Sequence, residues 1–215
     1  PHMLPRQEAW AKIMSSLGIN NNDDILIYDN SDLKSSCRCW FSLLYFGHDE
    51  KKIHILNGGL KKWIFENKPI TKDATEIIES NYVANEKENL VVSFDQIKKN
   101  ILSKSFNVID ARSLERFEGK VSEPRKGLRS GHIQNSFCLP FNLCINQKTG
   151  EFKNLKELRE LFNQNENIEK RLDQVFTCGS GVTAAVLAYA YKMVNNDYIP
   201  KIYDGSWSEY GKYPA

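Results

Sequence analysis

The sequence predicts an α/β protein whose sheets are mainly parallel and flanked by helices. Short apolar runs alternate with segments of helical spacing along most of the 215 residues, which is typical of this class. The chain is longer than a usual single domain, so either one large domain or two small domains are expected. The second half also repeats the order of elements in the first half, which indicates an internal duplication.

The first half carries two short strands, each followed by a helix. Ile25 to Tyr28 is an apolar run typical of a buried parallel strand, and residues 37–46 follow with helical spacing. Ile53 to Leu56 predicts a second strand. This strand ends at Asn57-Gly58-Gly59, and a helix is expected from Leu60 to Phe65.

A polar segment over residues 71–92 is interpreted as a linker to the second half. Ser93 and Gln96 form the pattern of a capped helix start, and residues 107–110 predict the next strand. The elements expected after it are a helix at 155–162, a strand at 174–177, a helix at 182–194 and a strand at 201–203. This alternation predicts a parallel sheet in the second half.

The duplication places a different residue at the same strand end in each half. Asp29 matches Cys178 at an offset of 149 positions, and Gly58 matches Gly205 at an offset of 147. Because an aspartate offers no thiolate, we expect the first half to be catalytically silent. The first-half counterparts of residues 94–150 would precede residue 1. Either the sequence is a piece of a longer one, or the first domain has lost half of its fold.

Composition and charge exclude several classes of function. Hydrophobic residues make up 41% and charged residues 26%, as in ordinary globular proteins. Basic and acidic residues, 29 against 27, are interspersed, so no nucleic-acid partner is implied. The apolar runs are too short for a membrane span and no leader is recognised, so we expect a cytoplasmic protein without a membrane partner. Pro1, His2 and Met3 are interpreted as a cloning remnant.

The five cysteines do not form a disulfide or zinc pattern. They occupy positions 37, 39, 138, 144 and 178, without a Cys-x-x-Cys pair. The first four are interpreted as small core residues. No spacing in the sequence implies a metal or an organic cofactor.

The fifth cysteine lies between a predicted strand and a predicted helix. Backbone N–H groups and the positive end of the helix dipole face such a position, and both stabilise a thiolate and attached anions. Gly179 and Gly181 allow the backbone to curl round the sulfur, and Ser180 and Thr183 add hydroxyl donors. We therefore expect Cys178 to hold a bound sulfur atom in a cradle of hydrogen-bond donors.

The loop Cys178-Gly179-Ser180-Gly181-Val182-Thr183 resembles the active-site loop of the rhodanese superfamily, in its 3-mercaptopyruvate sulfurtransferase version. The other segments that carry the resemblance are residues 108–112, 116–119, 123–125, 131–133, 139–141 and 203–207, with 56–60 and Trp63 in the first half. The resemblance implies two rhodanese-like domains, each a mainly parallel sheet flanked by helices. The first, at 4–70, is incomplete and silent, and the second, at 93–213, is catalytic.

The resemblance also implies a reaction and residue roles. The Cys178 thiolate attacks the sulfur of a small-molecule donor, becomes a persulfide, and passes the sulfur to a thiol such as thioredoxin or to cyanide. Arg116 and Arg125 carry over as the residues that hold the donor's carboxylate. The remaining substrate-binding residues that it implies are Gly179, Ser180, Gly181, Val182 and Thr183.

Two further positions are interpreted as structural. Asp110 and Arg112 resemble an ion pair that supports the loop, and His132 is expected to be a structural histidine rather than a general base.

Three alternatives stay open at this point. Thiosulfate-using relatives carry two basic side chains where this loop has Gly179 and Ser180, so a neutral loop favours mercaptopyruvate over the thiosulfate dianion. Phosphatases with a Cys-x5-Arg loop need an arginine where this chain has Ala184, which argues against phosphatase activity. A weakly active sulfur-carrier or regulatory module is the third alternative.

Overall fold

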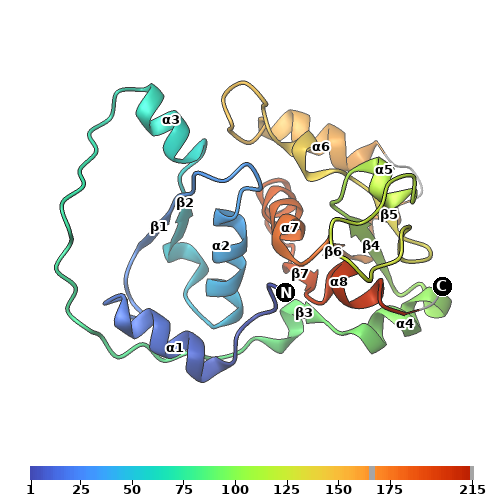
Figure 1. Cartoon of the computed structure of the whole chain (residues 1–215), viewed down its shortest axis with the longest axis horizontal. Helices are drawn as coiled ribbons and strands as arrows, with labels where there is room; N and C mark the ends of the chain where they lie inside the picture. Colours follow the sequence, from blue (N-terminus) through green and yellow to red (C-terminus); the bar gives the residue numbers. More distant parts are fainter. Residues whose placement is uncertain (165–167, 214–215) are drawn as a thin grey trace.

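The computed structural model describes residues 1–164 and 168–213 and contains two parallel sheets flanked by helices (Figure 1). The first sheet has two strands and the second has five, in the order β3-β7-β6-β4-β5. Every strand pair in both sheets is parallel. The α/β class predicted from the sequence is confirmed.

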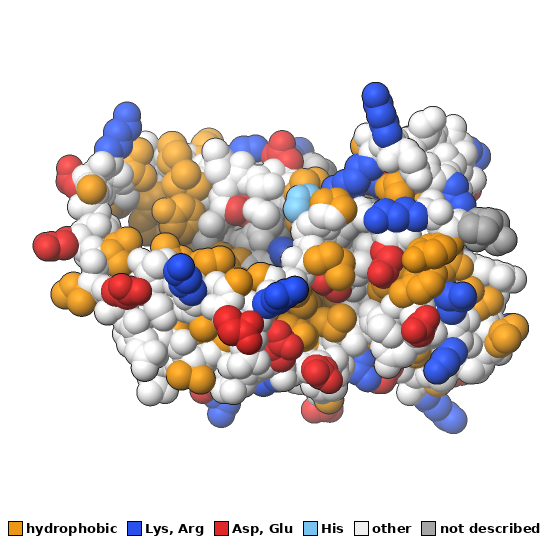
Figure 2. Space-filling model, turned by 60° about the horizontal axis from the view of Figure 1, so that its bottom comes forward, with side chains coloured by type: hydrophobic (Ala, Val, Ile, Leu, Met, Phe, Trp, Pro, Cys, Tyr) orange, Lys and Arg blue, Asp and Glu red, His pale blue; other side chains and the backbone are white. Residues whose placement is uncertain are grey.

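The first half is a small βαβα unit preceded by a helix. Its elements are α1 (Gln7–Ser16), β1 (Ile25–Ile27), α2 (Ser36–Tyr45), β2 (Ile53–Ile55) and α3 (Gly59–Phe65). β1 pairs with β2 in parallel, with Ile25 opposite Ile53. Leu26 and Tyr28 are each 58% exposed, and among the described residues β1 pairs with β2 alone. Figure 2 shows hydrophobic side chains gathered in a hollow on this side of the molecule.

The second half holds the larger sheet. Its strands are β3 (Val91–Val92), β4 (Phe106–Asp110), β5 (Phe137–Cys138), β6 (Asp173–Thr177) and β7 (Lys201–Tyr203). Its helices are α4 (Phe94–Ser103), α5 (Leu114–Phe117), α6 (Leu155–Asn163), α7 (Val182–Val194) and α8 (Ser206–Tyr210). β6 lies at the centre, with Val108 of β4 opposite Val175. The end of β6 therefore lies at the middle of one edge of the sheet.

Local sequence explains where two of these helices begin. Ser93 and Gln96 form a capping box at the start of α4, as their pattern predicts. Asn154 and Glu157 form a second capping box at the start of α6. Each box satisfies backbone donors that the first helical turn would otherwise leave unpaired.

The two halves share one hydrophobic core. Helix α2 of the first half packs against α7 of the second, and Figure 1 shows the two helices side by side. Trp40 of α2 meets Tyr189 of α7 edge to face, with ring centroids 5.0 Å apart. Buried apolar side chains from both helices belong to the same cluster. This interface fixes the first half beside the end of β6.

The connection between the halves is extended and follows the outside of the molecule (Figure 1). Residues 66–87 contain neither helix nor strand. Tyr82 and Ala84 are nevertheless buried against the first half. Val91 and Val92, which the sequence places at the end of the linker, pair with β7 in the second sheet.

Surface charge is mixed on the face that Figure 2 shows, with basic and acidic side chains interspersed. Within the described residues, no helix is both long enough and apolar enough to cross a bilayer.

Candidate active site

The candidate nucleophile lies at the end of the central strand. Cys178 directly follows β6, is separated from the start of α7 by three residues, and is only 2% exposed. The backbone N–H of Gly181 donates to its Sγ at 3.1 Å. Because α7 is 13 residues long, the positive end of a helix dipole also faces this sulfur. Backbone donors and a helix N-terminus both stabilise negative charge held close to them.

Gly181 is the residue that allows the turn. Its φ is +82°, in the left-handed region, where a side chain is disfavoured. A Cβ at this position would lie 2.9 Å from Nη1 of Arg38 and 3.2 Å from the backbone oxygen of Asp204. Only glycine fits both the turn and its close neighbours.

The start of α8, which follows β7, holds the backbone of the cysteine loop in place. Trp207 N–H donates to Cys178 O at 2.9 Å, and Ser208 N–H donates to Gly179 O at 2.9 Å. The Ser206 hydroxyl oxygen accepts from Cys178 N–H at 3.4 Å. These bonds fix the loop backbone independently of any substrate.

The two arginines assigned to the donor's carboxylate converge over Gly179. A Cβ on Gly179 would lie 3.1 Å from Arg116 Nη2 and 3.5 Å from Arg125 Nη1. The glycine therefore leaves room for both guanidinium groups beside the sulfur cradle. Arg116 lies in α5, and Arg125 lies in the loop that follows α5.

Only one of these arginines is free of acidic partners. Arg116 is paired with Glu123, whose Oε2 lies 2.6 Å from Nη2. Within the described residues Arg125 forms no ion pair, and it donates to Ser180 Oγ at 3.1 Å. Arg125 is thus the better placed cation for an incoming anion.

A buried network supports this loop, as the sequence predicts for Asp110 and Arg112. Their side chains are bonded through Nη2 and Oδ2 at 2.6 Å, and Arg112 also reaches Glu123 at 2.8 Å. Burial lowers the pKa of Arg112, but the bonds to Asp110 outweigh that effect and the net shift is upward. The guanidinium stacks over Trp207 at 4.4 Å.

His2 is a site residue that the sequence analysis missed. Its Nδ1 lies 2.8 Å from Ser180 Oγ, and Arg125 donates to the same hydroxyl. Desolvation, followed by the charges of Arg125, the N-terminus and Arg38, lowers the pKa of His2 below its ordinary value of 6.5. A neutral His2 can accept a proton from Ser180 beside the sulfur.

Arg38 is the second residue that was missed, and it comes from the first half of the chain. Its guanidinium donates to Asp204 Oδ1 at 2.6 Å and to Gly181 O at 3.3 Å. Leu4 N–H donates to the other oxygen of Asp204 at 2.9 Å. The first half therefore holds the cysteine loop directly. No local pattern signals this contact, since Arg38 and Gly181 are 143 positions apart.

The remaining predicted loop residues lie in the first turn of α7. Val182 is its first residue, and Thr183 follows, both half-buried. The Thr183 hydroxyl has no hydrogen-bond partner among the described residues, whereas Ser180 has two. The structure brings Cys178, Gly179, Ser180 and Gly181 together with both arginines.

The other cysteines are unsuited to thiolate chemistry. Burial raises the pKa of Cys138 to about 12 and that of Cys144 to about 12. Burial also raises the pKa of Cys37, and desolvation raises that of Cys39, although Cys39 is exposed and is therefore not the core residue that the sequence predicts. His132 stacks on Phe117 at 4.0 Å and bonds to its backbone oxygen, which fits a structural role. The described residues contain no cluster suited to a metal ion.

In the first half, a carboxylate replaces the thiol. Asp29 Oδ2 accepts from Ser36 N–H, at the start of α2, at 2.6 Å. Its backbone oxygen accepts from Leu60 N–H at 2.9 Å, as Cys178 O accepts from Trp207 N–H. Six residues separate Asp29 from α2, against three between Cys178 and α7. The longer loop does not form a tight cradle.

Comparison with known proteins assigns both halves to one family. The family model described as the rhodanese-like domain matches residues 2–66 and 93–213. Thiosulfate/3-mercaptopyruvate sulfurtransferase 2 of Arabidopsis thaliana is 39% identical, over 99% of this chain and 67% of that protein. The mitochondrial sulfurtransferase 1 of the same name and organism is 36% identical, over 100% of this chain and 61% of that protein.

A solved structure gives the same result. The crystal structure of SseA from Escherichia coli, titled as a 3-mercaptopyruvate sulfotransferase, superposes with a TM-score of 0.83 at 34% identity. The match covers 97% of this chain and 76% of SseA.

Proposed function

The chain belongs to the rhodanese family of sulfurtransferases, and from that premise we propose that it moves sulfur from 3-mercaptopyruvate to a thiol through a persulfide on Cys178. The observation that supports this most is the cradle at the end of β6. It combines an N–H bond to the sulfur, a helix dipole and two converging arginines.

The charge of the cradle favours a monoanionic donor. Arg116 and Arg112 are balanced by Glu123 and Asp110. Arg38 is balanced by Asp204. With His2 neutral, the Arg125 guanidinium is left as the one unbalanced charge among these groups. Mercaptopyruvate brings one carboxylate, whereas thiosulfate is a dianion, so mercaptopyruvate is the better electrostatic match.

The reaction proceeds in two displacements. The Cys178 thiolate attacks the sulfur of mercaptopyruvate, an S–S bond forms, and the donor's C–S bond breaks. The bonding electron pair passes to carbon as the enolate of pyruvate, which takes up a proton. An acceptor thiolate then attacks the outer sulfur, the S–S bond breaks, and Cys178 leaves as a thiolate.

Two groups of the site serve these steps. The Arg125 guanidinium grips the donor's carboxylate through parallel hydrogen bonds, with Arg116 beside it. Ser180 and His2 exchange a proton next to the sulfur, because the hydroxyl lies 2.8 Å from Nδ1. The loop residues Gly179, Gly181, Val182 and Thr183 surround the bound donor.

Thiosulfate is the second candidate donor. Relatives that match nearly the whole chain carry both donors in their names, and the two arginines would also attract thiosulfate. Thioredoxin and cyanide are the proposed acceptors. A reducing, cytoplasmic location is proposed because all five cysteines are free. The proposed domain division is a silent first domain at 4–70, a linker at 71–92 and a catalytic domain at 93–213.

The ratio of kcat/KM for the two donors tests this proposal. We expect a higher value with mercaptopyruvate than with thiosulfate. In Arg125→Lys, the KM for mercaptopyruvate should rise about tenfold or more, because a lysine cannot form the paired bonds. Lys126→Gln, an exposed neighbour, is the matched control. An equal or reversed ratio of the two donors would remove mercaptopyruvate as the preferred substrate.

A further inference from the structure

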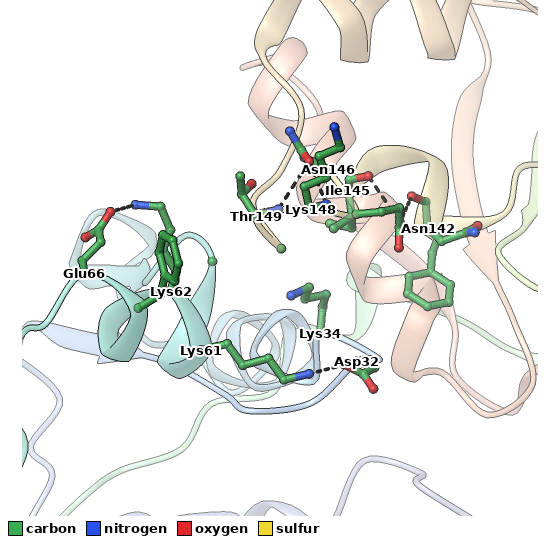
Figure 3. A pocket seen from close by; sticks show the side chains of 15 residues that line it. Asp32, Lys34, Lys61, Lys62, Glu66, Asn142, Ile145, Asn146, Lys148 and Thr149 are labelled. Atoms are coloured by element: carbon green, nitrogen blue, oxygen red, sulfur yellow. Dashed lines mark hydrogen bonds and ion pairs between the residues drawn. The ribbon is translucent and has the colours of Figure 1, made fainter.

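A cavity lies between the two halves, away from Cys178. It has a volume of about 670 Å³, in the range that small organic ligands occupy. One wall comes from the loop after β1 and from α3, and the other from the segment at 141–150 (Figure 3). The residues used below are Asp32, Lys34, Phe65, Phe141, Ile145 and Lys148.

Its place in the first half corresponds to that of the sulfur cradle in the second. The cavity is lined by residues of the loop that follows Asp29, the counterpart of Cys178, and by Gly58, the counterpart of Gly205. The Asp29 carboxylate already accepts from the N–H groups of Ser36 and Ser31. It offers no nucleophile, so a molecule in this cavity would be bound without covalent chemistry.

The cavity carries unbalanced positive charge. Lys61 is paired with Asp32 at 2.6 Å, and Lys62 is paired with Glu66 and, at 3.6 Å, with Glu151. Lys34 and Lys148, on opposite walls, form no ion pair within the described parts of the chain. Lys34 reaches across the cavity, because its Nζ lies 3.2 Å from where a Cβ on Gly150 would be. The side chains of Lys34 and Lys148 both line the cavity, from opposite walls (Figure 3).

Apolar side chains complete the lining. Phe65, on the wall formed by α3, is 86% exposed. Phe141 and Ile145 lie on the other wall. An apolar group between these side chains would remove hydrocarbon surface from water.

We propose that this cavity is a second, non-covalent binding site for a small organic anion that carries one carboxylate or sulfonate on an apolar ring. Lys34 and Lys148 bind the acidic group, and Phe65, Phe141 and Ile145 contact the ring. The site is separate from the sulfur-transfer site and uses none of its residues.

Titration of the full chain with 1-naphthalenesulfonate, followed by NMR of the backbone amides, tests the proposal. We expect saturable binding with a Kd below about 1 mM and shifts at Gly58, Thr149 and Gly150. The double variant Lys34→Gln/Lys148→Gln should weaken binding by about tenfold or more, since it removes two charge-assisted contacts. Lys12→Gln on α1 is the control and should bind like the unaltered chain.

Two further measurements separate this site from the catalytic one. Methanesulfonate, which lacks the ring, and naphthalenemethanol, which lacks the charge, should each bind more weakly than naphthalenesulfonate. The double lysine variant should keep its kcat/KM for sulfur transfer, and Cys178→Ser should keep its affinity for naphthalenesulfonate. No saturation at about 1 mM, equal affinity in the double variant, or shifts confined to the Cys178 loop would each overturn the proposal.

Discussion

The His2 imidazole gives the site a titratable group beside the Ser180 hydroxyl. Its pKa is lowered by desolvation and by nearby positive charge, and its Nδ1 contacts Ser180. A neutral imidazole can take the hydroxyl proton, and a protonated one cannot. The catalytic contribution of His2 is therefore present above its depressed pKa and is lost as the pH falls through it.

A pH profile of kcat/KM checks this role. We expect an acidic limb at a pH below the ordinary histidine value of 6.5, and the limb should disappear in His2→Gln together with most of the activity. His132→Gln is the control, because that ring contacts Phe117 and lies outside the cradle. An unchanged limb in His2→Gln would assign the titration to another group.

At the residue scale, the sequence predicts those site residues that lie next to Cys178 along the chain. The glycines and hydroxyls next to Cys178 predict a sulfur cradle because they are contiguous with it. His2 and Arg38 carry no such signal, since each meets the loop only through tertiary packing over 143 or more positions. The interpretation of residues 1–3 as a cloning remnant also left His2 out of the predicted site.

At the element scale, α2 positions the cysteine loop through Arg38. The Arg38 guanidinium bonds to Gly181 O and to Asp204 Oδ1. Gly181 in turn donates its N–H to the sulfur of Cys178. Movement of the loop by a fraction of an ångström would misalign that donor.

Arg38→Gln should therefore lower kcat by roughly ten- to a hundredfold with a smaller change in KM, because Arg38 does not touch the donor. Arg38→Lys keeps one cationic donor and should recover part of the loss. Steady-state kinetics and a thermal unfolding curve of each variant separate positioning from instability. Full kcat in a folded Arg38→Gln protein would contradict the assignment.

Helices and strands were predictable where they are long enough to show a clear apolar pattern or a capping motif. The long apolar run of α7 and the capping box of α4 gave those helices and their starts. The strands β3 and β5 have two residues each, too few for a periodic pattern. Helix α1 was also missed, because only Met14 of its ten residues is buried. Tertiary pairing decides such short or exposed elements.

At the scale of the molecule, the two halves should unfold as one unit. Trp40 is 2% exposed and packs on Tyr189 across the interface between α2 and α7. Trp40→Ala should lower the free energy of unfolding by about 3–5 kcal/mol, through lost burial and the cavity left behind.

Urea denaturation followed by circular dichroism measures this effect. A single transition shifted to lower urea is expected for Trp40→Ala. Trp63→Ala is the matched control, because that indole bonds to Pro69 O on the surface and its loss should cost about 1 kcal/mol. Two separate transitions in the unaltered chain would show that the halves fold independently.

The class of fold and the duplication could be read from the sequence, because strand and helix periods and a repeated order of elements are local features. The packing of α2 against α7 could not, since it depends on which faces meet in three dimensions. That packing brings the first half to the Cys178 loop, a contact that the sequence of neither half indicates on its own.

The central claim is that Cys178 carries the transferred sulfur. Mass spectrometry of the full chain after incubation with mercaptopyruvate, with pyruvate measured in the same sample, tests it most directly. The account predicts one added sulfur atom on the peptide that contains Cys178, one pyruvate released per persulfide, and neither in Cys178→Ser. Sulfur on a different cysteine, or pyruvate released without a Cys178 persulfide, would contradict it.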